Sequence, residues 1–261
     1  MPRSAVRHYE LKQKEHDPVY LLKKHGENYE LKPAGPRPVP GRNNSGAGLT
    51  TRGEIKGMSS ASWGRLVLFV SRITNLSGFA TLTLPGDWRK AAPTAIVLKN
   101  HFNAHLKRIH RNFPQHCQGH IWILEFQERG APHFHYWTVG DPPTPEASAF
   151  LCDDWERRTG AHRNEWAPLL KTDGAARYVG KEGGKRLQKV PPQGWKPGRL
   201  WGHRGALQMD DVETVGPVAQ SELPPEVLTK FRSPYRTVFG EVLPEELKRR
   251  VAARPEYQLP K

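Results

Sequence analysis

Three segments in the middle of the chain carry the hydrophobic pattern of strands. Residues 78–84 (GFATLTL) alternate between apolar residues and threonine up to a Pro-Gly turn. Residues 119–127 (GHIWILEFQ) and 132–139 (PHFHYWTV) are rich in aromatic and β-branched residues. Only four residues connect the last two segments, a length typical of a hairpin. The pattern therefore predicts one strand followed by an antiparallel pair.

Apolar residues recur at the helical period between and after these strands. Residues 93–112 place apolar side chains close to a 3.6-residue period, and residues 145–158 and 174–182 are two further predicted helices. The stretch 63–76 (WGRLVLFVSRITNL) fits either a strand or a short helix. This order of elements predicts an α+β fold class, in which flanking helices pack on a central antiparallel β-sheet.

Composition divides the chain into three parts. Residues 1–60 show no sustained period apart from a possible short helix at 17–24, and residues 33–57 are rich in Pro, Gly, Asn, Ser and Thr. We interpret 1–60 as a flexible basic arm or linker, 61–212 as the folded domain and 213–261 as a helical or extended C-terminal tail.

The charge balance indicates a polyanionic partner. The 261 residues include 40 Lys and Arg against 26 Asp and Glu, a formal net charge of +14. No apolar run approaches the roughly 18–20 residues of a membrane span, and Met1–Tyr20 lacks the apolar region of a secretory signal. We therefore expect a cytoplasmic protein without a membrane partner. The two cysteines, Cys117 and Cys152, lack the spacing of a zinc finger.

The charge is concentrated in blocks. Residues 86–113 hold six Lys and Arg against one acidic residue, and residues 171–206 hold nine against two, whereas residues 114–170 are acidic. Basic blocks on either side of an acidic segment suggest a nucleic-acid surface around a site with its own carboxylates, although each cation alone also fits a solvated surface. Trp195 is a further candidate for stacking on bases. The candidate DNA-binding residues are Arg89, Lys90, Lys99, Lys107, Arg108, Arg111, Arg177, Lys185, Arg186, Lys189, Trp201 and Arg204.

The predicted hairpin carries a set of metal-ligating side chains. His133 and His135 alternate with Phe134 and so project from one face, and Glu125 and Gln127 share a face of the neighbouring strand. Two imidazoles and a carboxylate suit a divalent ion such as Mg²⁺, Mn²⁺ or Zn²⁺. The alternative is an aromatic-rich strand whose histidines only pack.

The predicted helix 174–182 carries a tyrosine and a lysine on one face. Tyr178 and Lys181 are three residues apart, so both can reach the same phosphate. A phenol beside a metal ion and an ammonium group can serve as a nucleophile. The alternative is a packed tyrosine ring next to a solvated lysine.

Taken together, these segments resemble the HUH endonuclease superfamily, and in particular the rolling-circle replication initiator (Rep) proteins of plasmids and single-stranded DNA phages. The resemblance rests on FATLTLP at 79–85, EFQERGAPHFHYW at 125–137 and RYVGKEGGK at 177–185, and it covers about residues 75–206. It implies a sheet of about five strands with the histidine strand in the centre. It also makes 61–212 an HUH endonuclease domain of the single-tyrosine type.

The resemblance implies roles for the candidate residues. His133, His135 and Glu125, with Gln127 as the substitute third ligand, would hold Mn²⁺ or Mg²⁺. Glu125 is preferred because an anionic oxygen binds a hard ion better. Tyr178 would attack the scissile phosphate, and Lys181 would stabilise the charge that develops there.

The function implied is that of a sequence-specific single-stranded DNA endonuclease and strand transferase. It would nick a replication origin through a 5′-phosphotyrosine intermediate and initiate rolling-circle replication of a plasmid or phage. The expected partners are single-stranded or hairpin DNA at the origin, a host helicase and a polymerase. Two alternatives stay open: a single-tyrosine transposase or relaxase, and a non-catalytic nucleic-acid-binding module with an RNA-recognition-like sheet.

Overall fold

The computed structural model describes residues 19–26, 28–34, 55–169, 175, 178, 179, 190–223 and 237–239. The chain divides into two compact units. The larger unit is Gly46–Asp210, and the smaller one combines Met1–Ser45 with Asp211–Lys261.

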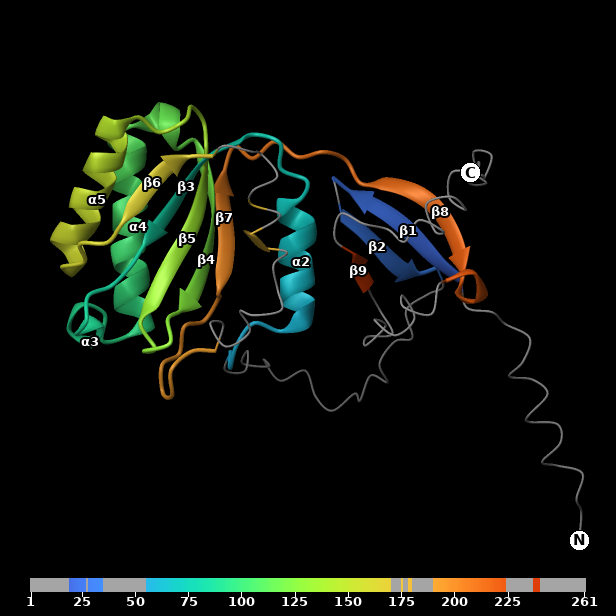
Figure 1. The fold of residues 1–261 in the computed structure, drawn as a ribbon, viewed down its shortest axis with the longest axis horizontal. Helices are drawn as coiled ribbons and strands as arrows, with labels where there is room; N and C mark the ends of the chain where they lie inside the picture. The colour runs from blue at the N-terminus through green and yellow to red at the C-terminus, as the bar shows by residue number, and fades with distance from the viewer. Residues whose placement is uncertain are drawn as a thin grey trace, which may run out of the picture. The chain divides into compact units, whose positions relative to one another are not determined.

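The larger unit is built on a five-stranded antiparallel sheet with the strand order β6-β3-β5-β4-β7 (Figure 1). The histidine-bearing strand β5 occupies the centre, as the resemblance predicts. The α+β fold class is likewise confirmed. The strands are β3 (Leu76–Leu82), β4 (Gly119–Phe126), β5 (Pro132–Val139), β6 (Glu165–Pro168) and β7 (Trp201–Gly205).

Two long helices, α4 (Ala95–Asn112) and α5 (Pro145–Thr159), cover one face of this sheet (Figure 1). Each starts at a threonine whose hydroxyl caps the first turn, because the hydroxyl of Thr94 accepts from the Val97 amide and that of Thr144 from the Ala147 amide. The starts and ends agree with the predicted helices to within two residues.

The ambiguous stretch after residue 60 forms a helix, α2 (Ser60–Val70). Its apolar residues Leu66, Val67 and Val70 are buried, and the hydroxyl of Ser59 accepts from the Ser62 amide at its start. The shorter elements of this unit are α3 (Trp88–Ala91) and the 3₁₀ turn η1 (Pro114–His116). Across the described residues, no helix is both long and apolar enough to cross a membrane.

Aromatic packing joins the sheet to α4. The ring of Phe102 on α4 stacks on Phe134 of β5 with centroids 3.9 Å apart, and it meets Trp122 of β4 edge to face. Because side chains alternate along a strand, the burial of Phe134 and Tyr136 against the helices turns His133 and His135 to the opposite face.

The smaller unit is a four-stranded antiparallel sheet with the order β8-β1-β2-β9. Leu22, Leu31, Val218 and Leu223 form its core. Its strands are β1 (Val19–His25), β2 (Asn28–Pro33), β8 (Glu213–Ala219) and β9 (Thr237–Phe239), and the 3₁₀ turn η3 (Gln220–Glu222) follows β8.

This sheet corrects the interpretation of the first 60 residues. The prediction made residues 19–33 part of a flexible arm and put a short helix at 17–24, whereas they form two paired strands. The physical reason is a partner far away in sequence, because β1 pairs with β8 from residue 213 onward. Residues 213–219 of the predicted tail are extended, and the rest of that tail after 223, apart from 237–239, lies outside the described residues.

A buried ion-pair network joins α4 to α5. Nδ1 of His105 lies 2.8 Å from Oδ2 of Asp154, and Nε of Arg158 donates to the same oxygen at 2.8 Å. Nε of Arg108 lies 3.2 Å from the other oxygen. Burial lowers the pKa of His105, an effect that the hydrogen bond to Asp154 only partly offsets. Burial alone would raise the pKa of Asp154, but its bonds to His105 and Arg158 outweigh burial and bring the pKa to about 2.

This network predicts a loss of stability in acid. For both groups the pKa in the folded protein is below that in the unfolded chain. The unfolded chain therefore binds more protons, and the free energy of unfolding decreases as the pH is lowered. For Asp154 the loss, about 2 kcal/mol, occurs as pH falls from 3.8 through about 2. Asp154→Asn should remove this dependence in denaturant titrations at several pH values. The exposed neighbour provides a control, Asp153→Asn, which should leave it intact. An unchanged pH dependence in Asp154→Asn would contradict the assignment.

Candidate active site

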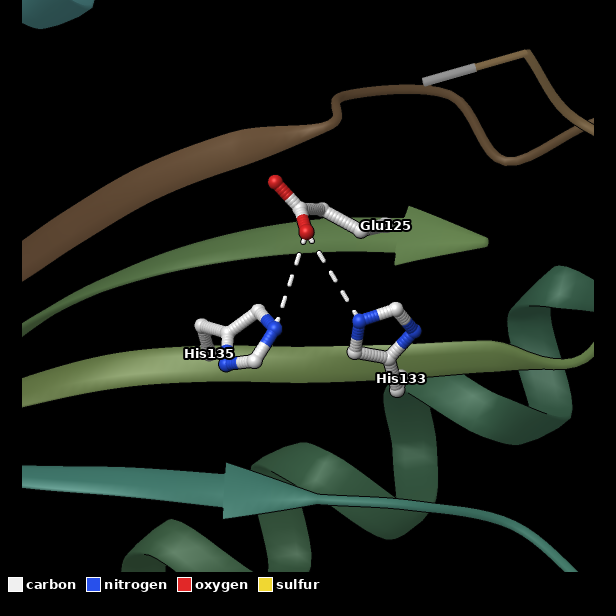
Figure 2. A group of neighbouring side chains, drawn as sticks. All are labelled: Glu125, His133 and His135. Atoms are coloured by element: carbon white, nitrogen blue, oxygen red, sulfur yellow. Dashed lines mark ion pairs between the residues drawn. The ribbon is translucent and has the colours of Figure 1, made fainter. Parts of the chain in front are cut away.

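Glu125, His133 and His135 lie together on the face of the sheet away from α4. Glu125 is on β4, directly opposite His133 of β5 in the antiparallel register, and His135 is two residues further along β5. Figure 2 shows both imidazole rings turned toward the carboxylate of Glu125. Strand alternation and the hairpin register therefore bring these three side chains together.

The geometry of the three side chains fits a divalent ion. Nε2 of each histidine lies 3.6 Å from Oε2 of Glu125, which is too long for a hydrogen bond. The ligand atoms of the three residues lie within 4.8 Å of one another. Ligand atoms bonded to one ion at about 2.1 Å lie roughly 3–4 Å apart, so small shifts would close this group around an ion. Glu125 is 1% exposed, and a carboxylate so deeply buried favours a positive charge beside it.

Strand β3 contributes two contacts to His135. Its Nδ1 lies 3.1 Å from Oγ1 of Thr81, and the ring of Phe79 stacks on its imidazole with centroids 5.6 Å apart. Phe79 and Thr81 are not among the predicted site residues. The alternation in 78–84 puts both on one face, but only the register of β3 with β5 shows which residue they meet.

Tyr178 joins this group. Its hydroxyl donates to Oε2 of Glu125 at 3.3 Å, the oxygen that both histidines approach. Its half-buried ring packs among Phe79, His135 and Trp137, with centroid distances of 5.7, 5.0 and 5.4 Å. Burial raises the pKa of Tyr178 well above its ordinary value, and the charge of Glu125 and its hydrogen bond raise it further. The phenol is therefore neutral here.

The metal and tyrosine motifs, predicted separately, thus meet at one carboxylate. Ala175, Tyr178 and Val179 are helical, and Ala175 and Val179 are buried. Lys181, the predicted partner of Tyr178, lies outside the described residues. The other candidates outside them are Arg177, Lys185, Arg186 and Lys189.

Gln127, the predicted substitute for the third ligand, has a hydrogen-bond partner in the β4–β5 turn. Its side-chain oxygen accepts from Nε of Arg129 at 2.8 Å. The guanidinium of Arg129 also donates to the backbone carbonyls of Leu84 and Pro85, both at 2.7 Å, and of Gly86 at 3.2 Å. Arg129 therefore ties the β4–β5 turn to the segment after β3. Arg129 is not among the predicted site residues, because its role depends on backbone carbonyl groups that no residue pattern reveals.

Several predicted DNA contacts have partners within the fold. The ammonium group of Lys99 donates to the carbonyls of Pro197 and, at 2.7 Å, of Arg199, and burial together with the charge of Arg199 lowers its pKa to about 8. Lys99 therefore holds the segment before β7 through these two hydrogen bonds. Arg108 belongs to the Asp154 network.

The remaining basic candidates are exposed or on the far face. Arg89 lies over the Trp88 ring at 4.5 Å, and Lys90 pairs with Asp87 at 3.0 Å. Lys107 and Arg111 are exposed on α4, which packs on the face opposite Glu125. Arg204 is exposed on β7.

The two tryptophans proposed to stack on bases differ in exposure. Trp195 is only 5% exposed and packs edge to face against Trp88 and Phe126, so it offers no open ring face and the prediction for it is wrong. Trp201 is half-buried, and its Nε1 donates to the hydroxyl of Ser62 at 3.0 Å.

A family model matches the central part of the chain. Residues 77–205 match the family model described as Replication-associated protein ORF2/G2P. This segment runs from β3 to the end of β7 and includes Glu125, His133, His135 and Tyr178. Searches of the curated proteins and of the solved structures gave no match.

From the geometry of the site we expect metal binding to depend on the carboxylate of Glu125 and not on the amide of Gln127. Glu125→Gln keeps the shape and removes the charge, and it should weaken Mn²⁺ binding by more than about 100-fold, since even outer partners of metal ligands contribute 10–100-fold. Gln127→Ala should bind Mn²⁺ within about threefold of the wild type. Titration calorimetry measures both, and a larger loss for Gln127→Ala would contradict the assignment.

Proposed function

Through residues 77–205 the chain belongs to the Replication-associated protein ORF2/G2P family, a family of rolling-circle replication initiators of the HUH type, and we propose that it nicks single-stranded DNA through Tyr178. Cleavage at a replication origin would leave the 5′ end linked to the tyrosine and a free 3′-hydroxyl that primes synthesis. The DNA would be a plasmid or phage origin in single-stranded or hairpin form. A host helicase and a polymerase would then act on the nicked strand.

One observation carries the proposal, namely the contact between Tyr178 and Glu125. A nucleophile must reach the phosphorus while the oxygens of the same phosphate are held by positive charge. The phenol oxygen lies 3.3 Å from the carboxylate oxygen that two imidazoles also approach. One phosphate group can therefore contact the tyrosine and the ligand group together.

Glu125, His133 and His135 would hold the ion, with Mn²⁺ or Mg²⁺ as the proposed cofactor. When bound, such an ion polarises the scissile phosphate and offsets the negative charge of the transition state. The remaining chemistry belongs to Tyr178. Its oxygen forms a bond to phosphorus, and the bond from phosphorus to the 3′-oxygen breaks. The phenol loses its proton and the departing 3′-oxygen gains one. The reverse attack by a 3′-hydroxyl would reseal or transfer the strand.

The surroundings of Tyr178 suit this role. Packing against Phe79 and Trp137 restricts the ring, and a restricted nucleophile loses less freedom on reaching the phosphorus. A phenol with an ordinary pKa of about 10 is already protonated at neutral pH, so the proton leaves during attack. Lys181 stays the proposed contact to the phosphate.

The alternative of a non-catalytic binding sheet has less support. Such a sheet stacks bases on exposed aromatic side chains. In β5, Phe134, Tyr136 and Trp137 are at most 1% exposed. The family match favours a replication initiator over a single-tyrosine transposase or relaxase, which would use the same chemistry.

Covalent trapping tests the nucleophile. The wild type is incubated with Mn²⁺ and a hairpin oligonucleotide that is labelled at either its 5′ or its 3′ end. After denaturation the protein should retain the 3′ label, because the fragment on the 3′ side of the nick is the one linked to the tyrosine, and the 5′ label should be released. Tyr178→Phe should abolish the adduct, because the ring remains and only the attacking oxygen is lost. EDTA should abolish it as well, as should His133→Ala and His135→Ala.

The matched control is Tyr136→Phe, the same change on the opposite face of the sheet. Tyr136 is fully buried, and its hydroxyl has no hydrogen-bond partner within the described part of the chain. This variant should form the adduct at the wild-type level. An adduct in Tyr178→Phe would sink the proposal.

The salt dependence of DNA binding tests along which face of the five-stranded sheet the DNA strand runs. The logarithm of the affinity should fall with the logarithm of salt concentration by about 0.7 for each phosphate contacted. A double variant, Lys107→Ala with Arg111→Ala, should keep the wild-type slope, since α4 packs on the face opposite the site. Fluorescence anisotropy over a salt series measures both slopes. A slope reduced by 1 or more in the double variant would put the strand on the helical face.

A further inference from the structure

The two candidate histidine ligands differ in how their second ring nitrogen is placed. Nδ1 of His135 lies 3.1 Å from Oγ1 of Thr81, and Phe79 stacks on the ring with an interplanar angle of 8°. Nδ1 of His133 is buried and has no hydrogen-bond partner among the residues described. His135 is therefore held on two sides by β3, and His133 is not held in this way.

We propose that Thr81 is a positioning residue for metal binding, which accepts a hydrogen bond from Nδ1–H of His135 and so directs the Nε2 lone pair toward Glu125. The proposal rests on the metal site of the proposed function. Thr81 touches neither the ion nor the DNA in this scheme, and it acts only through His135.

The chemistry of imidazole explains what such a partner does. A neutral histidine carries one ring proton, and the nitrogen that binds a metal must be the one without it. Nε2 of His135 lies on the side of Glu125, so the proton belongs on Nδ1 when an ion is bound. A hydroxyl oxygen at hydrogen-bond distance from Nδ1 stabilises that tautomer and the orientation of the ring.

The position of Thr81 is fixed by the sheet. Thr81 and His135 are direct partners in the β3–β5 register, and the two strands are hydrogen-bonded neighbours near the middle of the sheet. A threonine is branched at Cβ, which limits its side-chain rotation in a strand. The hydroxyl is therefore held in place before any ion arrives.

The experiment compares three variants of the full chain in Mn²⁺ binding, followed by electron paramagnetic resonance. Thr81→Val removes the acceptor and keeps the shape, so its dissociation constant should rise about 10–100-fold. Thr81→Ser keeps the hydroxyl and should stay within about threefold of the wild type. Thr83→Val is the matched control, because the Thr83 hydroxyl donates to the Arg163 carbonyl at 2.7 Å and does not serve the site.

Thr81→Val binding Mn²⁺ as the wild type does, or Thr83→Val losing as much affinity, would overturn the proposal. Either outcome would overturn only the role of Thr81, provided that the wild type binds Mn²⁺ and forms the DNA adduct. A wild type that binds no Mn²⁺ would overturn both.

A measurement on the wild type does not depend on how the variants fold. Nitrogen-15 shifts of His135 in the Mg²⁺-loaded protein, assigned with His135→Gln, distinguish a protonated from an unprotonated Nδ1. We expect the proton on Nδ1. A proton on Nε2 would overturn the proposal.

Discussion

The side chains of β5 point alternately to two different environments, and the site depends on this alternation. Phe134 and Tyr136 enter the core beneath α4, and His133 and His135 face the other way. The aromatic core fixes the register, because a shift by one residue would put both histidines among the helices and two aromatic rings in the site. The stacked pair of Phe102 and Phe134 is thus a structural condition for the candidate metal site, although neither residue is one of its proposed ligands.

On the site face, the buried carboxylate of Glu125 is the central group. A carboxylate taken out of water is costly unless positive charge or hydrogen bonds compensate it. The neighbours described around its Oε2 are a phenol and two imidazoles. A carboxylate and two imidazoles suit a divalent cation, and burial together with the negative charge of Glu125 raises the pKa of Tyr178. The carboxylate therefore affects both the ligand set and the nucleophile.

The sequence predicted the features that depend on local periodicity. Alternation predicted the hairpin and placed Glu125 with His133 and His135, and the helical period predicted α4 and α5. Features that depend on distant pairing were not predictable in this way. Thr81 meets His135 only through the β3–β5 register, and β1 is a strand because β8 pairs with it from nearly 200 residues away.

The three segments that carry the family resemblance form one physical network. Arg129, in the turn between β4 and β5, donates to the carbonyls of Leu84, Pro85 and Gly86 at the end of the first segment. Tyr178, in the third segment, reaches Glu125 in the second. The second segment is thus joined to each of the other two by a hydrogen bond. The three motifs are short and separated along the chain, and these contacts hold them together on the five-stranded sheet.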